Sequence, residues 1–245
     1  MKNSLNKSQV ERFSRQLVLK NIGPKGQKKI LSSKVLIVGI GGLGCPAAEN
    51  LVRAGVGTIG LIDNDTVNLS NIHRQSLFNS KDIKKPKVNV AAKKLKEINP
   101  LTIIKTYKSR LNQNNINQII KNYEIIIDGT DNFKTKFLIN DYCLKYKKKL
   151  VTGAISKFDG HIFTFNFKDN KTASLKSFYQ EKEISDDILN CEFEGVIGTT
   201  ASIVGATQAN EALKLILEIG HSLKNQILII DLLNLNFRKV KFKKK

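Results

Sequence analysis

The sequence predicts an α/β fold of the Rossmann-like, doubly wound type: a mostly parallel sheet, extended by antiparallel C-terminal strands, with helices on both faces. Short β-branched segments alternate with helical patterns over residues 34–154, and such alternation builds a parallel sheet through right-handed crossovers. A glycine-rich turn joins the first of these strands to the first helix. Residues 161–167 then change to a period of two, which predicts a strand with one exposed face.

A chain of 245 residues that is 41% hydrophobic can bury one sizeable core, so we expect a single domain over residues 1–245. The N-terminus is polar, and no apolar segment approaches the roughly 20 residues that a membrane-spanning helix needs. Cys45, Cys143 and Cys191 are isolated, which fits a reducing compartment better than a disulfide framework. We therefore expect a cytoplasmic protein without a membrane partner.

The net charge of +20 raises the question of nucleic-acid binding. The lysines are spread along the chain, however, and the runs at residues 147–149 and 243–245 are typical of solvated ends. This distribution argues against a nucleic-acid groove. A positive surface would instead steer an acidic protein partner or ATP by long-range attraction.

The remaining elements follow from apolar spacing and from glycine and proline breaks. Residues 4–20 are predicted to form a helix, because Val10, Phe13 and Leu17 make one apolar stripe. Residues 23–26 break the chain before a short helix over residues 27–31. The later predictions are strands at 102–107, 124–128, 150–154, 227–231 and 236–242, helices at 114–121, 134–146 and 197–219, and a polar crossover loop at 168–194.

The glycine turn over residues 39–44 has the sequence GIGGLG and opens a helical pattern. Gly39 allows the tight turn, Gly41 lets a bound anion approach the backbone, and Gly44 permits close packing of helix against strand. Asp63 ends the next strand, where a carboxylate can hold a ribose hydroxyl. The pattern predicts nucleotide binding, and a merely structural turn is the alternative.

Two later features are placed to contact phosphates. The loop over residues 64–75 is polar and should lie beside the glycine turn, at the carboxyl edge of the sheet. Lys87 follows Pro86 at the start of a predicted helix. A cation there opposes a helix dipole that favours anions by about 0.3–1 kcal/mol. Because the position is unfavourable unless an anion is near, it favours Lys87 as a phosphate ligand.

Several motifs together resemble one enzyme family. They are GIGGLG at 39–44, IDNDTVNLSNIHRQ at 62–75, KKPKV at 84–88, DGTDN at 128–132 and ERFSRQ at 11–16. In this order, over nearly the whole chain, they resemble the ThiF/MoeB/HesA family, the bacterial relatives of ubiquitin-activating enzymes. The resemblance implies ATP- and Mg²⁺-dependent adenylylation of a ubiquitin-like sulfur carrier at its C-terminal Gly-Gly, in molybdopterin or thiamin thiazole biosynthesis. It also implies a homodimer and a cysteine desulfurase or rhodanese as sulfur donor.

The resemblance assigns roles residue by residue. Arg74 and Lys87 are expected to contact phosphates, and Asp131 to bind Mg²⁺. Arg15, on pattern alone a solvated helix charge, is expected to reach the ATP γ-phosphate of the neighbouring subunit. Asn71 is expected at the phosphate and ribose region, with Asp63 at the ribose. The full expected ATP-binding set is Gly39, Gly41, Gly42, Gly44, Asp63, Asp65, Asn71, Arg74, Gln75, Lys87, Asp131 and Asn132.

Other residues keep two interpretations. Asp128 ends a strand and either belongs to the site or only caps the next turn, and Asp131 has a helix N-cap as its alternative role. Cys191 lies near the place where thiamin-pathway relatives carry a sulfur-linked cysteine, or it is incidental. Arg53 and Arg110 are interpreted as surface charges.

Many relatives bind a structural zinc through two CxxC pairs, one of which would fall near residues 172–178. This chain has Ser174-Leu175-Lys176-Ser177 there and ends in lysines. Tetrahedral zinc needs about four Cys or His ligands. The scattered cysteines cannot supply them, so we expect no structural zinc; Cys45 is assigned to helix packing and Cys143 to the core.

Three rival functions are an NAD-binding Rossmann oxidoreductase, a tRNA-modifying relative of the same superfamily, and an inactive nucleotide-binding module. The first has no evident hydride-transfer acid or base and leaves Arg74, Lys87 and Asp131 without a role. The second suits the positive charge but not the TDN form of residues 130–132. The third is disfavoured because, apart from the missing zinc ligands, no motif position is visibly damaged. The sequence does not identify the carrier or its pathway.

Overall fold

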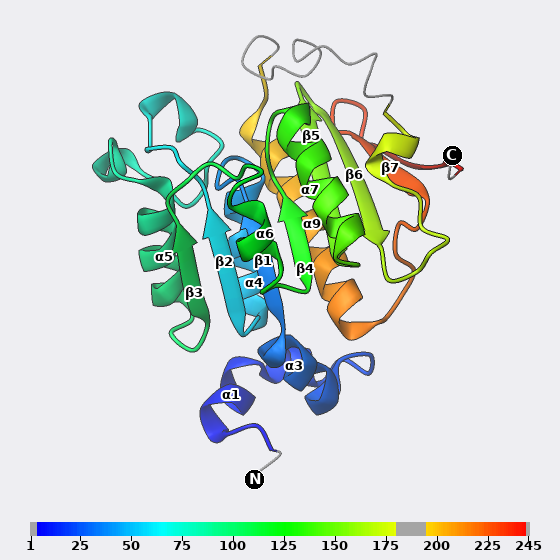
Figure 1. The fold of residues 1–245 in the computed structure, drawn as a ribbon. Helices are drawn as coiled ribbons and strands as arrows, with labels where there is room; N and C mark the ends of the chain where they lie inside the picture. The colour runs from blue at the N-terminus through cyan, green and yellow to red at the C-terminus, as the bar shows by residue number, and fades with distance from the viewer. Residues whose placement is uncertain (1–3, 180–194, 244–245) are drawn as a thin grey trace.

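A computed structural model describes residues 4–179 and 195–243. Within them, one eight-stranded sheet has the order β3-β2-β1-β4-β5-β6-β7-β8 (Figure 1). The strands are β1 (Lys34–Val38), β2 (Thr58–Ile62), β3 (Ile103–Tyr107), β4 (Ile125–Asp128), β5 (Lys149–Ser156), β6 (Asp159–Asn166), β7 (Gln226–Asp231) and β8 (Asn236–Lys241). The helices are α1 (Lys7–Arg12), α2 (Ser14–Leu17), α3 (Gly23–Ser32), α4 (Gly44–Ala54), α5 (Lys87–Ile98), α6 (Ile116–Ile120), α7 (Phe133–Lys145) and α9 (Gly198–Leu217).

The parallel half of the sheet places the functional motifs at one edge. Strands β3, β2, β1, β4 and β5 are parallel, and the register pairs Val38 with both Ile62 and Asp128. Because the carboxyl ends of parallel strands meet at the same edge, the segments after β1, β2 and β4 lie next to one another. The predicted doubly wound sheet, with its antiparallel C-terminal extension, is confirmed.

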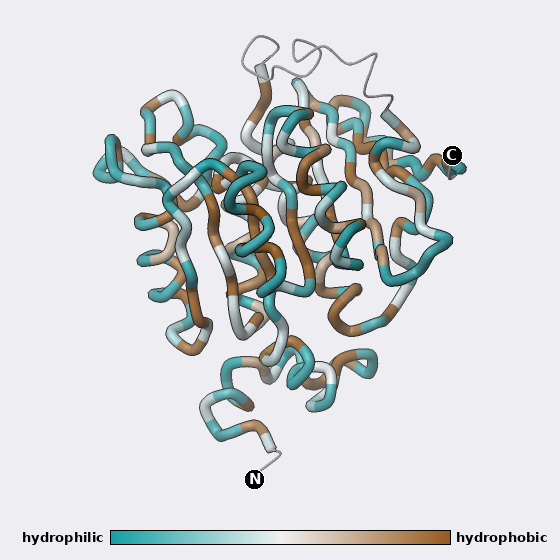
Figure 2. Tube along the Cα trace, in the orientation of Figure 1, coloured by the Kyte–Doolittle hydropathy of each residue, from teal (hydrophilic) through white to brown (hydrophobic). Residues whose placement is uncertain are grey.

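Helices cover both faces of the sheet and enclose two apolar cores. Helices α3, α4, α5 and α9 pack on one face, around residues such as Ile37 and Leu61. Helices α6 and α7 pack on the other face, around Leu36, Ile126 and Phe165. Figure 2 shows the consequence: the central strands are hydrophobic along their length, whereas the outer turns of the helices are hydrophilic. Within the described residues, no helix has both the length and the apolar character required to cross a membrane.

Strand β6 is buried on both faces, so the prediction of one exposed face is wrong. Phe163 and Phe165 belong to the core beneath α7, whereas Ile162 belongs to the core beneath α9. The polar residue of the alternating pattern, Thr164, is 2% exposed, and its hydroxyl donates to the buried carboxylate of Glu211 on α9 (3.1 Å). A side-chain partner thus replaces the water that the pattern implied.

The N-terminal segment also differs from its prediction. Two short helices, α1 and α2, replace one helix over residues 4–20, and they meet at Phe13. Phe13 is 1% exposed because its ring lies against Gly55, where a Cβ would come within 2.5 Å of it. Val10, from the same predicted stripe, is 46% exposed. The predicted break at residues 23–26 is instead the first turn of α3, which accepts Pro24 because the first helical amides need no intrahelical acceptor.

Polar and apolar contacts hold the segment where relatives would bind zinc. The amide of Leu175 donates to the buried Asn140 (3.0 Å), and the Leu175 side chain is 1% exposed. The amide of Ala173 donates to Asn225 (2.8 Å). Within residues 4–179 and 195–243, no three His, Cys, Asp or Glu side chains gather as metal ligands. The absence of structural zinc stays a prediction, which metal analysis of the purified protein can test.

Phe13 provides a stability test of how the N-terminal segment docks. Phe13→Ala should lower the free energy of unfolding by about 3–5 kcal/mol, because it removes a fully buried ring and leaves a cavity beside Gly55. Phe237→Ala is the matched control, since Phe237 is 57% exposed, and it should cost less than about 1 kcal/mol. Urea denaturation followed by circular dichroism measures both. Equal costs would show that Phe13 does not anchor the segment.

Candidate active site

A cleft of about 260 Å³ lies at the carboxyl edge of the parallel strands. It collects residues that follow β1, β2, β3 and β4, together with Lys87 at the start of α5. Its lining residues include Gly39, Gly41, Asp63, Asp65, Lys87, Arg110, Asp131 and Asn132. A second cavity, of about 690 Å³, shares Arg110, Leu111 and Thr135 with the cleft. The structure therefore brings together seven of the twelve residues expected to bind ATP.

The glycine turn depends on direct contact between backbones. Gly39 has φ +84°, and a Cβ there would lie 3.0 Å from the carbonyl oxygen of Gly129 in the turn after β4. A Cβ on Gly44 would lie only 1.9 Å from the carbonyl oxygen of Gly39, so any larger residue would push α4 off the turn. Gly41 has open space instead: the only atom near the position of a Cβ is the side-chain nitrogen of Gln75, at 3.7 Å. The backbone at Gly41 is thus free for a ligand to approach.

Asp63 ties the end of β2 to the glycine turn. Its carboxylate accepts hydrogen bonds from the amides of Ile40 (2.7 Å) and Asp65 (2.8 Å). Burial raises the pKa of Asp63 above its ordinary value, although Lys87 and these two amides act in the opposite direction. A carboxylate has about four acceptor positions, so lone pairs remain for a hydroxyl donor in the cleft.

Lys87 is 5% exposed, and its ammonium group forms an ion pair with Asp65 (3.0 Å). Its own amide also donates to the Asp65 carbonyl (3.0 Å). Asp65 therefore supplies the anion that a cation at the start of a helix requires. Because the Asp65 side chain is 56% exposed and lines the cleft, an incoming phosphate could compete for Lys87 at this edge.

Asp131 presents an exposed carboxylate to the cleft, whereas its neighbour caps the following helix. Asn132 is the N-cap of α7, and its side-chain oxygen accepts the amide of Thr135 (2.9 Å). The alternative role of Asp131 as that N-cap is therefore wrong. The Asn132 amide group also donates to Asp131 (3.2 Å), which fixes one carboxylate oxygen.

The segment over residues 69–75 contacts the glycine turn but does not line the cleft. The aliphatic part of Arg74 lies 3.6 Å from the position of a Cβ on Gly42. Its guanidinium donates to the Ser70 carbonyl (3.0 Å) and to the His73 ring (2.8 Å). Gln75 is 3% exposed, and its side-chain oxygen has no hydrogen-bond partner in the described residues. Asn71, Gly42 and Gly44 likewise do not line the cleft.

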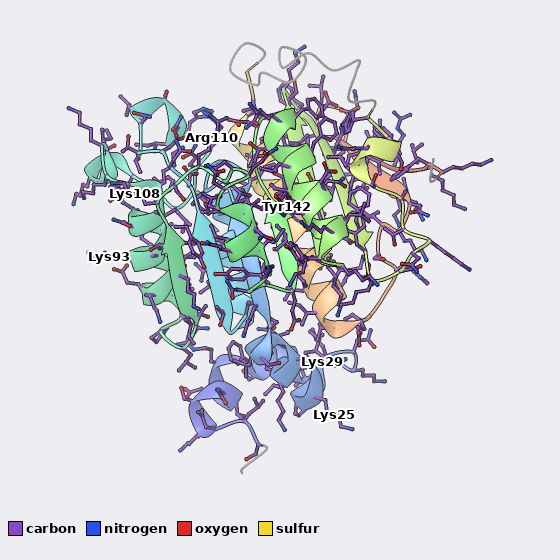
Figure 3. The ribbon with its side chains drawn as sticks, in the orientation of Figure 1. Lys25, Lys29, Lys93, Lys108, Arg110 and Tyr142 are labelled. Carbon is purple, nitrogen blue, oxygen red and sulfur yellow. The ribbon has the colours of Figure 1, made fainter. Side chains whose placement is uncertain are left out.

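The two arginines interpreted as surface charges lie in different places. Arg53 is a surface charge, as predicted, paired with Glu49 on the outside of α4. Arg110 is exposed, in agreement with its interpretation as a surface charge, and it also lines the cleft; Figure 3 shows it at the end of the sheet where β1, β2 and β4 terminate. Its position after β3 was the missed signal, because that segment also reaches the carboxyl edge. Asn112 and Asn115 hold the Arg110 carbonyl (3.3 and 2.9 Å).

Arg15 lies on α2, between α1 and α3 in the chain, and Figure 1 shows α1 and α3 at the end of the sheet opposite the carboxyl ends of β2 and β4. Nearby, Arg12 donates to the Ile98 carbonyl at the C-terminus of α5 (3.0 Å). Arg15 is exposed and cannot serve the cleft of its own chain. The expectation that it serves a neighbouring subunit stays a prediction.

The described cysteines are structural. Cys45 and Cys143 are both 0% exposed, as predicted. Burial raises the pKa of the Cys45 thiol to about 12 and that of Cys143 well above its ordinary value, so neither is a nucleophile at neutral pH. The sulfur-transfer assignment of Cys191 lies outside the described residues.

The donors in the cleft suit a nucleotide with Mg²⁺ better than a metal held by protein alone. Within the described ranges no cluster of carboxylates, histidines and cysteines surrounds a point, but Asp131 offers one exposed carboxylate. Mg²⁺ is commonly bound through one or two carboxylates and the phosphates of a substrate. Asp131 fits the first part of that arrangement, and the open backbone at Gly41 fits the approach of the phosphates.

Known proteins resemble this chain along almost its full length. "Sulfur carrier protein adenylyltransferase" from Thermus thermophilus is 37% identical over 96% of this chain and 88% of its own length. "Probable molybdopterin-synthase adenylyltransferase" from Gracilaria tenuistipitata var. liui is 39% identical over 97% of this chain, which spans 66% of that protein. A crystal structure of E. coli MccB with ATP shares the fold, with a TM-score of 0.85 at 20% identity over 99% of this chain and 73% of that one.

The model of the ThiF family matches residues 13–245, a range that includes every strand of the sheet and the whole cleft. The match agrees with the resemblance that the glycine turn and the motifs at 62–75 and 128–132 indicated. This chain belongs to the ThiF family.

Proposed function

We propose that this protein is an adenylyltransferase that activates the C-terminal glycine of a ubiquitin-like sulfur carrier with ATP. The observation that carries the proposal is the convergence of an open glycine turn, Lys87 and Asp131 at one cleft in a ThiF-family chain. The names of the Thermus and Gracilaria relatives support the same reaction. The carrier serves molybdopterin or thiamin thiazole synthesis, and the Gracilaria relative favours the first.

In the reaction, a carboxylate oxygen of the carrier attacks the α-phosphorus of ATP. A new P–O bond forms, the bond from the α-phosphorus to the bridging oxygen breaks, and pyrophosphate leaves with those electrons. The carboxylate is already ionised at neutral pH, so no general base is required. The barrier lies in orienting two anions and in stabilising charge on the phosphates.

Residues of the cleft and of the 69–75 segment beside the glycine turn divide this work. Backbone amides of the glycine turn bind phosphate, and Asp63 accepts a ribose hydroxyl. Lys87 leaves Asp65 to neutralise phosphate charge, and Arg74 turns from Ser70 towards the same charge. Mg²⁺, held by Asp131 and the phosphates, would supply further charge neutralisation.

A second copy of the chain completes the proposed site. Arg15 belongs to α2 in the N-terminal segment, which lies at the end of the sheet opposite the carboxyl ends of the strands, so a neighbouring subunit would have to bring it to the ATP γ-phosphate. The protein is accordingly a homodimer in this proposal, and a cysteine desulfurase or rhodanese would supply sulfur to the activated carrier. The named relatives favour neither an NAD-dependent oxidoreductase nor a tRNA-modifying enzyme.

Carrier-dependent ATP–pyrophosphate exchange tests the proposed reaction. Lys87→Ala, Arg74→Ala and Asp131→Ala should each reduce exchange by about 100-fold or more, since each removes a group that would bind or neutralise the reacting phosphates, directly or through Mg²⁺. Lys93→Ala is the control, because Lys93 is an exposed cation on the same helix as Lys87 (Figure 3) and should retain full activity. Near-normal exchange in all three site variants would refute the assignment.

Arg110 should contribute to ATP binding more than to chemistry. It lines the cleft beyond Asp131 and Asn132, so we expect Arg110→Ala to raise the KM for ATP by about 3–10-fold with kcat changed less than about twofold. Lys108→Ala, two residues away on the exposed edge, is the matched control. Steady-state exchange kinetics over a range of ATP concentrations separates the two parameters. Equal KM values for the wild type and Arg110→Ala would show that Arg110 is a surface charge without a role in ATP binding.

Subunit mixing tests the assignment of Arg15. Arg15→Ala and Asp131→Ala dimers should each be inactive, but a heterodimer would contain one site with neither substitution. If subunits exchange freely, half of the dimers are heterodimers with one intact site of two, and activity should recover to about one quarter of wild type. Pyrophosphate exchange before and after incubation of the mixture measures this recovery. Absence of recovery, with exchange of labelled subunits verified, would place Arg15 outside the partner's site.

A further inference from the structure

A buried ion pair lies directly behind the cleft, between Asp128 at the end of β4 and Lys136 on α7. The two side chains are 1% and 3% exposed, and the ammonium nitrogen lies 3.0 Å from a carboxylate oxygen. Of the salt bridges in residues 4–179 and 195–243, it is the most deeply buried. Neither side chain lines the cleft, so neither contacts the reacting groups directly in the proposed reaction.

The Asp128 carboxylate divides its acceptor positions between the core and the turn over residues 129–132. One oxygen accepts the amide (2.9 Å) and the hydroxyl (2.6 Å) of Thr130, which is the middle of that turn. The other oxygen accepts from Lys136 and from the hydroxyl of Thr152 on β5. Four donors therefore fix the orientation of the carboxylate, and through Thr130 they fix the turn.

Lys136 in turn fixes the pair to the rest of the fold. Its ammonium group also donates to the Gly153 carbonyl on β5 (2.6 Å). The Gln208 side chain, from α9, donates to the backbone carbonyl of Asp128 (2.8 Å). Elements from both layers and from two adjacent strands thus converge on the residue that begins the turn.

The turn held in this way carries the cleft's metal-binding candidate. Gly129 packs against Gly39, Thr130 is bonded to Asp128, and Asp131 and Asn132 line the cleft. We propose that the Lys136–Asp128 pair is a positioning device, which holds the 129–132 turn so that the Asp131 carboxylate faces the nucleotide and its Mg²⁺. The inference rests on the proposed adenylylation, because it assigns Asp131 the same ligand.

Burying two charges costs free energy, and this cost favours a positioning role for the Lys136–Asp128 pair over a role in stabilising the fold. Two ions removed from water lose hydration that their attraction seldom repays, and apolar residues of the same volume often stabilise a fold as well or better. The side chains of Lys136 and Asp128 are almost fully buried, so water has little access to either charge. What the charged pair provides, and an apolar pair would not, is a carboxylate oxygen of fixed direction for the Thr130 amide and hydroxyl.

The experiment compares Lys136→Met, Lys136→Arg and the control Glu211→Gln. Glu211 is a buried acid on α9 whose hydrogen bonds are with Thr164, Lys214 and Leu223 and not with Asp128 or the turn, so Glu211→Gln alters an equally buried acid without removing a bond to Asp128. Two readouts are needed: hydrogen–deuterium exchange of the peptide over residues 129–132, and the Mg²⁺ concentration for half-maximal carrier-dependent pyrophosphate exchange. Thr152→Val, an isosteric change that removes one donor to Asp128, keeps the test valid if Lys136→Met does not fold.

We expect Lys136→Met to increase amide exchange in the turn at least about tenfold, as a locally released segment does, and to raise the half-maximal Mg²⁺ concentration several-fold. Lys136→Arg should restore both values, Thr152→Val should shift both in the same direction by less, and Glu211→Gln should shift neither. Unchanged exchange in the turn, or a loosened turn with an unchanged Mg²⁺ requirement, would overturn the proposal. If wild type shows no pyrophosphate exchange, the proposed function fails, whereas the amide-exchange result still decides whether the pair holds the turn.

Discussion

The candidate site depends on one steric constraint, the contact between the bare backbones of Gly39, Gly44 and Gly129. The Gly44 position leaves no room for a Cβ, and the Gly39 position leaves little. This contact lets α4 begin directly after the turn, while the backbone of Gly39 and Gly41 lines the cleft. The hydrogen bond from the Ile40 amide to Asp63 then sets the distance between the turn and the end of β2.

Charge balance explains why such a cleft would take a nucleotide together with a cation. The protein carries a net charge of +20, yet the cleft is lined by Asp63, Asp65 and Asp131 against Lys87 and Arg110. The protein's positive charge can therefore attract an anion from a distance, but it does not neutralise a triphosphate inside the cleft. Lys87 becomes available only by leaving Asp65. A divalent cation held by Asp131 would supply the missing charge without that exchange.

Local signals predicted most of the fold and part of the site. Strand and helix positions followed from apolar periodicity and glycine turns, because these depend on residues close in sequence. The errors concern long-range contacts. The predicted N-terminal helix is interrupted at Phe13, whose ring packs against Gly55, and Thr164 is buried with its hydroxyl donating to Glu211. The position of Arg110 at the cleft was missed for a similar reason, because it depends on β3 ending at the same edge as β1, β2 and β4. The sequence alone does not reveal that Lys136 reaches back to Asp128. Lysines are common on the exposed faces of the helices of this protein, and the sequence pattern does not distinguish Lys136 from them.

Two ion pairs at this edge illustrate how one scaffold separates a movable charge from a fixed one. Lys87 pairs with Asp65 at the cleft wall, where 56% exposure of the carboxylate lets water or phosphate replace it. Lys136 pairs with Asp128 in the core, where the lack of water makes separation costly and the geometry permanent. The first pair can therefore respond to substrate, whereas the second cannot. Helices α5 and α7 supply one lysine to each pair. In the proposed reaction, these two helices would give a glycine turn that is common among nucleotide-binding folds its movable cation and its fixed neighbouring turn.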